Sequence, residues 1–167
     1  IEAGVFHPGL FFSSKVLVDY ISILNIENKS VLDVGTGSGI IAIFCAYQNA
    51  DVTGIDISPK AVKNAQKNAN INSLNVRFLE SDLFQDINGS YNFIFVNPPY
   101  YEGCVTSESD NAWRAGAGYS YFHTFFSTIN QVINKESQIY MILSDQCNLT
   151  EIQNIAEHND WTMNLVI

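Results

Sequence analysis

The sequence predicts an α/β fold in which a doubly wound, mostly parallel sheet carries helices on both faces. Two observations predict it. Short apolar, β-branched runs alternate with longer segments of helical periodicity along the whole chain, and this alternation is typical of consecutive βαβ units. The first two runs also carry an acidic residue at or near their ends and are followed by turn residues. No repeat, linker or charge block divides the 167 residues, so we expect one domain, residues 1–167.

The elements follow in order from their periodicity and from the residues that interrupt it. An apolar stripe that includes Phe12, Val16 and Ile23 predicts the first helix. The first strand breaks at a glycine turn, residues 35–39, which leads into the second helix. The expected helices are residues 11–24, 40–48, 59–70, 119–132 and 149–158. The expected strands are residues 30–34, 52–56, 75–80, 91–96, 138–143 and 161–167.

Turn residues set the other boundaries. Ser58 supplies a helix N-cap, and Pro59 fits the first helical turn. Pro98 and Pro99 end the fourth strand, because proline cannot donate hydrogen bonds within a central strand. Residues 102–118 are rich in Gly, Ser and Asp and predict a long loop. A loop of that length in a compact domain is often functional.

Composition narrows the classes of function. Eight Lys and Arg against seventeen Asp and Glu give a net charge of −9. This charge disfavours a protein that coats nucleic acid by non-specific binding to its phosphates. The three cysteines and three histidines are isolated in sequence, so neither a disulfide framework nor a metal site is predicted. No apolar run reaches the roughly 18 residues of a membrane span, and no basic segment precedes a short apolar one at the start. We therefore expect a cytoplasmic protein that does not act on membranes.

The segment from Asp33 to Gly39, DVGTGSG, predicts a nucleotide-binding turn at the end of the first strand. In a doubly wound sheet, ligands bind beyond the carboxyl ends of the strands. Missing β-carbons let a ligand approach the backbone, and the free amides of the following helix face it. Asp56, at the end of the second strand, is placed to accept two hydrogen bonds from vicinal ribose hydroxyls. Together these features favour a cofactor that contains adenosine over a glycine turn flanked by helix-capping acids.

The glycine spacing separates the candidate cofactors. A dinucleotide fingerprint is G-x-G-x-x-G, whereas this loop is G-x-G-x-G with Asp33 two residues ahead of it. That acid would repel a pyrophosphate but attract the amino group of a methionine moiety, which S-adenosylmethionine presents. The Walker pattern is absent because no Lys follows the glycines. We expect S-adenosylmethionine as the cofactor, and the same features disfavour an oxidoreductase.

A second motif, Asn97-Pro98-Pro99-Tyr100, follows the fourth strand. A planar amino nitrogen is a poor nucleophile because its lone pair is delocalised. The Asn97 side-chain oxygen and the Pro98 carbonyl can each accept one N–H and turn that lone pair toward a methyl donor. Tyr100 can stack on the planar group. In another setting the same string would be only a proline turn, but behind the glycine loop it predicts amino-group methylation.

With these motifs, the chain resembles the class I S-adenosylmethionine-dependent methyltransferases, which have a Rossmann-like fold. More narrowly it resembles the HemK family, which methylates the glutamine amide of peptide-chain release factors. The resemblance covers nearly the whole chain. The matching segments are Val5-Phe6-x-Pro8, residues 31–39, residues 54–58, residues 81–84, residues 97–100, and Ala112-Trp113 with Gly116 and Gly118.

The resemblance implies roles for individual residues. Asn97, Pro98 and Tyr100 would be the catalytic, substrate-contacting residues, and no metal is implied. The residues that would contact the cofactor are Asp33, Gly35, Thr36, Gly37, Gly39, Asp56, Ile57, Ser81, Asp82, Leu83 and Asn97. The chain departs from the family pattern at residues 9–14, where the family shows an acid with Thr or Ser. In the family, the sheet ends in a hairpin with a seventh strand, whereas this sequence stops in the predicted sixth strand. It also begins at Ile1 and not at Met, so we expect a trimmed chain.

The function expected is methyl transfer from S-adenosylmethionine to a planar exocyclic nitrogen, first of all a protein glutamine amide. A nucleobase amine, adenine N6 or guanine N2 of RNA or DNA, is the alternative acceptor, so the partner is a release-factor-like protein or a nucleic acid. The aromatic tract 119–126 could stack bases, but at helical spacing it predicts core. A non-catalytic, cofactor-binding scaffold subunit is a further alternative, although Asn97 and both prolines are intact.

Overall fold

The computed structural model describes residues 12–104 and 114–166. The sequence segments Val5 to Pro8 and Ala112-Trp113 therefore lie outside the described residues. The strands are β1 (Ser30–Val34), β2 (Asp51–Asp56), β3 (Arg77–Glu80), β4 (Phe93–Val96) and β5 (Gln138–Met141). The helices are α1 (Phe12–Ile21), α2 (Ile40–Tyr47), α3 (Pro59–Ile71), α4 (Ser120–Thr128) and α5 (Leu149–Glu157), with 3-10 turns at Ala117–Tyr119 and Ile129–Gln131.

The described strands form one parallel sheet in the order β3-β2-β1-β4-β5. The chain builds outward from β1 through β2 to β3, then crosses to the other side of β1 for β4 and β5. The switch in direction falls between β1 and β4, where Val34 is paired with Val96 at the carboxyl ends. This is the doubly wound arrangement predicted from the sequence, and it creates a ligand crevice at the ends of β1 and β4.

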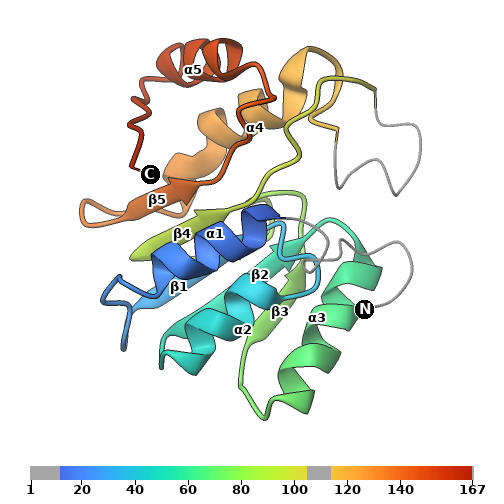
Figure 1. The fold of residues 1–167 in the computed structure, drawn as a ribbon, viewed down its shortest axis with the longest axis vertical. Helices are drawn as coiled ribbons and strands as arrows, with labels where there is room; N and C mark the ends of the chain where they lie inside the picture. The colour runs from blue at the N-terminus through green and yellow to red at the C-terminus, as the bar shows by residue number, and fades with distance from the viewer. Residues whose placement is uncertain (1–11, 105–113, 167) are drawn as a thin grey trace.

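Helices lie on both faces of the sheet (Figure 1), and a hydrophobic layer packs them against each face. Leu17 of α1 and Cys45 of α2 pack in one layer, with Val31 and Phe93 of the sheet. The second layer joins residues of the opposite face of β1 and β4 to α4 and α5. Its helical members include Phe122, Phe125, Ile152 and Ile155. Alternate strand residues thus point to different layers, as expected for a sheet buried on both faces.

Most predicted elements are present, with shifts at their ends. β1 has the predicted bounds, and Ser58 caps α3 by accepting a hydrogen bond from the Ala61 amide, with Pro59 at the first helical position. The long helix expected over residues 119–132 is shorter, because α4 ends at Thr128 and a 3-10 turn follows.

The predicted sixth strand, residues 161–167, is wrong for the described residues 161–166, which form no strand. Trp161 and Met163 are half-buried while Thr162 and Asn164 are exposed, so the segment has the alternation of a strand. A strand also needs a hydrogen-bonded neighbour. This segment and β5, the last strand of the sheet on that side, line a groove of about 820 Å³, and no ladder joins them.

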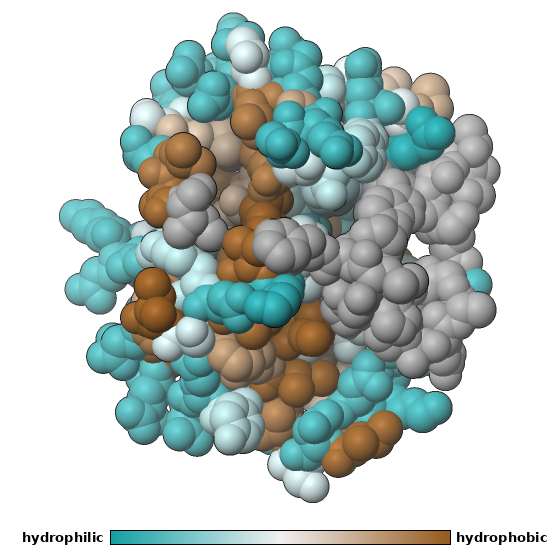
Figure 2. Space-filling model, viewed as in Figure 1, coloured by the Kyte–Doolittle hydropathy of each residue, from teal (hydrophilic) through white to brown (hydrophobic). Residues whose placement is uncertain are grey.

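Apolar side chains line much of that groove, including Ile139, Met141 and Trp161. Figure 2 shows hydrophobic side chains in a band that runs from top to bottom through the middle of the face viewed in Figure 1, with hydrophilic side chains to its left and around its top. Among the described residues, no helix has both the length and the apolar character that crossing a membrane requires.

Candidate functional site

Two glycines of the turn between β1 and α2 have different structural roles. Gly35 has φ 72°, and a Cβ added there would meet nothing within 4 Å, so the backbone is open to a ligand. Gly39 has φ 83°, and a Cβ there would lie 2.9 Å from Cβ of Ala65 in α3. Gly39 therefore serves the close packing of the turn against α3, while Gly35 leaves the approach to the backbone free.

Asp33 lies behind this turn and is fully buried. Its Oδ2 accepts hydrogen bonds from Thr36 Oγ1 at 2.6 Å and from the Ala42 amide at 3.1 Å. Its Oδ1 has no partner among the described residues. Burial raises the pKa of Asp33 to about 7, against the lowering effect of the two hydrogen bonds, and nearby Asp56 raises it further. The carboxylate ties the turn to the start of α2.

Asp56 ends β2 and is half-buried beside the same turn. Its Oδ2 accepts from the Gly37 amide and its Oδ1 from the Ser58 amide, each at 2.9 Å. Burial raises the pKa of this carboxyl, and the two amide hydrogen bonds oppose the rise. One hydrogen bond to each oxygen fixes the plane of the carboxylate and leaves each oxygen able to accept another.

The Asn97-Pro98-Pro99-Tyr100 turn follows β4 directly. Asn97 is half-buried, and its Nδ2 donates to Ser14 Oγ of α1 at 3.4 Å. The ring of Tyr100 packs against that of Tyr101, with centroids 4.9 Å apart. The Tyr101 carbonyl accepts from the Ala115 amide at 2.8 Å, so the chain on either side of residues 105–113 is joined here.

These elements share one cavity of about 330 Å³ at the carboxyl ends of the strands, a volume within the usual range of ligand sites. The predicted site residues that line it are Gly35, Thr36, Gly37, Asp56, Ile57, Ser81, Asp82, Leu83, Asn97, Pro98 and Tyr100. Asp33 and Gly39 do not line the cavity. Asp33 lies buried behind the wall, and its contact with a cofactor stays a prediction.

Ser81 and Leu83 form the part of the wall that follows β3. Ser81 is buried, and its hydroxyl donates to the Leu83 carbonyl at 2.8 Å and accepts from the Asp86 amide. Leu83 has φ 49°, so the chain turns sharply here. This turn leaves the Asp82 side chain exposed at the cavity.

Sequence reasoning missed several cavity residues. Tyr121 of α4 lines the cavity although the aromatic tract around it was predicted to be core. Burial raises its pKa, and Asp56 and Asp82 add to the rise. Its neighbours Phe122, Phe125 and Phe126 are buried as predicted. The one available signal was its hydroxyl, since a polar tip on an aromatic stripe favours the edge of a core.

Ser13 and Ser14 of α1 were missed as well, as was Arg114. Their contribution depends on long-range folding. Ser13 and Ser14 lie in residues 9–14, where the chain departs from the family pattern, and Arg114 lies between Trp113 and Gly116 of the matching tract, so nearby sequence was the available signal. Among the described residues, no group of three or more His, Cys, Asp or Glu side chains could hold a metal ion.

A parallel sheet in this order, with a glycine turn after β1, an acid ending β2 and Asn-Pro-Pro-Tyr after β4 around one cavity, defines a class I methyltransferase. The chain belongs to the methyltransferase small domain family, whose model matches residues 2–152. This match, together with the relatives described next, confirms the sequence-based identification of a class I S-adenosylmethionine-dependent methyltransferase similar to the HemK family.

Relatives are similar to parts of the chain. A Methanocaldococcus jannaschii protein named for N5-glutamine methyltransferase activity is 45% identical over 80 residues, 47% of this chain and 41% of that protein. The release factor glutamine methyltransferase of Flavobacterium psychrophilum is 42% identical over 97 residues, 56% of this chain and 34% of that protein. The chain thus spans less than half the length of these relatives.

A solved structure gives the same fold over nearly the whole chain. The ribosomal protein L11 methylase of Lactobacillus delbrueckii subsp. bulgaricus has a TM-score of 0.74 at 21% identity, covering 98% of this chain and 75% of that one. At that level of identity the likeness concerns the fold alone.

Proposed function

We propose that the protein binds S-adenosylmethionine in the cavity at the strand ends and transfers its methyl group to a planar nitrogen, in the first place a protein glutamine amide. The observation that carries this proposal is the placement of the Asn97 to Tyr100 turn on the same 330 Å³ cavity as the glycine turn and Asp56. In this proposal, one half of the cavity binds the cofactor and the adjoining half binds the nitrogen that accepts the methyl group.

The residues of the first half fit S-adenosylmethionine. The open space over Gly35 admits a ligand against the backbone. Asp56 is oriented by two amides and can accept from the two ribose hydroxyls. Asp33, with Oδ1 unpartnered behind the turn, favours a positively charged amino group in front of it. When bound, S-adenosylmethionine supplies an electrophilic methyl group on a sulfonium centre.

The second half fits a planar nitrogen. Asn97 Oδ1 and the Pro98 carbonyl are the acceptors proposed for its two N–H groups, and Tyr100 supplies a half-buried ring for stacking. Held in this way, the nitrogen directs its lone pair along the line of attack, and the acceptors stabilise the positive charge that develops on it. A proton then leaves through Asn97 or water.

The choice of a glutamine amide rests on two supports. The two relatives described above carry names for glutamine methylation, and the net charge of −9 works against binding to a polyanion. A 16S rRNA N2 G1207 methyltransferase of Thermus thermophilus has the same fold, so a nucleobase amine is the outcome to test against. The three cysteines are free, and we expect the protein to act in the cytoplasm.

Labelled S-adenosylmethionine separates these acceptors. The full-length protein is incubated with the cofactor and an undermethylated cell extract, and the product is digested in parallel with protease and with nuclease. Protease-sensitive label supports the proposal, and nuclease-sensitive label replaces it with a nucleobase acceptor. Cofactor binding without any labelled product would identify a scaffold subunit instead.

A further inference from the structure

Asn97 can act on an N–H only if its amide faces the right way. The oxygen and the NH₂ of an asparagine side chain are nearly the same size, and a half-turn about the last bond exchanges them. In one state the N–H of the substrate nitrogen faces the side-chain oxygen of Asn97, which can accept it. In the other state it faces the NH₂ group, which is also a donor. A hydrogen-bond partner that engages the NH₂ group favours the first state, because it leaves the side-chain oxygen for the methyl-accepting nitrogen.

The structure supplies such a group on α1. Among the described residues, Ser14 Oγ is the hydrogen-bond partner of the Asn97 side chain, at 3.4 Å from Nδ2. Ser14 has 3% of its surface exposed, although serine is usually an exposed residue. The contact is long for a hydrogen bond, and polar contacts of this kind commonly tighten once the reacting complex has formed.

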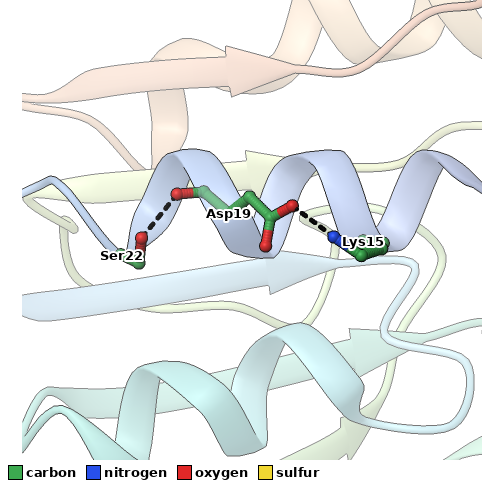
Figure 3. A network of polar contacts seen from close by, with 3 residues as sticks. All are labelled: Lys15, Asp19 and Ser22. Atoms are coloured by element: carbon green, nitrogen blue, oxygen red, sulfur yellow. Dashed lines mark hydrogen bonds and ion pairs between the residues drawn. The ribbon is translucent and has the colours of Figure 1, made fainter.

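Helix packing fixes the position of the Ser14 hydroxyl. Ser14, Leu17 and Ile21 recur at helical spacing on one face of α1, and Leu17 and Ile21 are buried against the sheet. The opposite face is in solvent, where Lys15 and Asp19 form an ion pair and Ser22 donates to the Asp19 carbonyl (Figure 3). Ser14 is thus held by a buried helix face and not by a flexible loop.

We propose that Ser14 is a positioning residue for the reaction, which accepts from Asn97 Nδ2 and thereby holds Oδ1 toward the acceptor nitrogen. The inference rests on the proposed function of Asn97. It assigns a role to a residue that lies 83 positions earlier in the chain, in a helix outside the glycine turn and the Asn-Pro-Pro-Tyr motif.

The first test needs no acceptor molecule. The side-chain NH₂ resonances of Asn97 are assigned by their loss in Asn97→Asp. Their hydrogen exchange is measured in wild type, Ser14→Ala and the control Ser22→Ala, which removes an exposed hydroxyl from the turn that directly follows the same helix. Faster exchange in Ser14→Ala alone supports the proposal. Equal exchange in all three proteins overturns it.

The second test is kinetic and uses unmethylated peptide-chain release factor as the probe. Ser14→Ala should lower kcat about tenfold, the usual weight of one such hydrogen bond, with the cofactor dissociation constant within about twofold. Ser14→Thr, which keeps the hydroxyl, should restore kcat to within about threefold. In the Asn97→Ala background, Ser14→Ala should have no further effect, because the group it positions is gone.

The results separate this inference from the function it rests on. If Asn97→Ala keeps its activity, the role of Asn97 and the proposed function of its turn fail together. If Asn97→Ala is inactive but Ser14→Ala has a normal kcat, or if the two effects multiply in the double variant, only the role of Ser14 is overturned. Cofactor binding by each variant shows that it is folded.

Discussion

Replacing Asp33 by Asn should flatten the dependence of stability on pH. Burial raises the pKa of Asp33 to about 7, whereas an Asp in an unfolded chain titrates near 3.9. Between these values the folded protein holds a proton that the unfolded chain has released. Unfolding is therefore favoured as pH rises through this window, and the loss of stability is complete above the folded-state pKa.

The size of the effect follows from that pKa difference. Of the range from pH 5 to pH 8, about two pH units, from 5 to about 7, lie between the unfolded-state and folded-state pKa values of Asp33. Each of these units lowers the free energy of unfolding by 1.36 kcal/mol, which gives a loss of about 2.7 kcal/mol. Asn cannot ionise, so the corresponding loss should be absent in Asp33→Asn. Titrating groups that do not interact with Asp33 contribute equally to both proteins.

Urea unfolding of wild type and Asp33→Asn at pH 5, 6, 7 and 8 measures this difference without cofactor. The gap between the two unfolding free energies should change by about 2.7 kcal/mol across the series, in favour of the variant at high pH. Parallel curves for the two proteins would refute the reasoning, because they would show that Asp33 titrates alike in the folded and unfolded states.

Four other substitutions test separate parts of the site. Asn97→Ala should leave the cofactor dissociation constant within a few-fold and lower turnover by at least about 100-fold; near-normal turnover would remove Asn97 from the reaction. Asp56→Ala should weaken cofactor binding roughly 10- to 100-fold by calorimetry, the weight of hydrogen bonds to a charged group, and an unchanged constant would contradict its place at the ribose. Gly39→Ala, which brings a Cβ to 2.9 Å from that of Ala65, should lose about 2–4 kcal/mol of stability. The matched Gly35→Ala, which meets open space, should lose about 1–2 kcal/mol from its positive φ alone, and equal losses would show that contact with α3 does not matter.

The sequence predicts those parts of the fold that local chemistry determines. Glycines set the end of β1, and Ser58 with Pro59 sets the start of α3, so both boundaries agree with the structure. The segment after Trp161 has the alternation of a strand but lacks a paired neighbour, and pairing is a property of the tertiary fold. The alternation of half-buried and exposed residues alone could not show that this neighbouring strand is missing.

The candidate site divides in the same way. The motifs at the ends of β1, β2 and β4 could be read from the sequence because each is short and complete in itself. Asp33 was expected on the cavity wall, but its depth depends on how the turn folds over it. Ser14 and Tyr121 reach the cavity from helices distant in sequence. Only the packing of α1 and α4 against the sheet shows that they belong to it.

The nature of the methylated nitrogen is tested most directly by the chemistry of the product. The labelled product formed by the full-length protein from methyl-labelled S-adenosylmethionine is hydrolysed completely in acid, and the hydrolysate is then made alkaline. An N-methylated glutamine amide is cleaved to glutamate and labelled methylamine, so we expect labelled methylamine that becomes volatile in alkali and is absent with Asn97→Ala. Label recovered in a methylated nucleobase would contradict an amide acceptor.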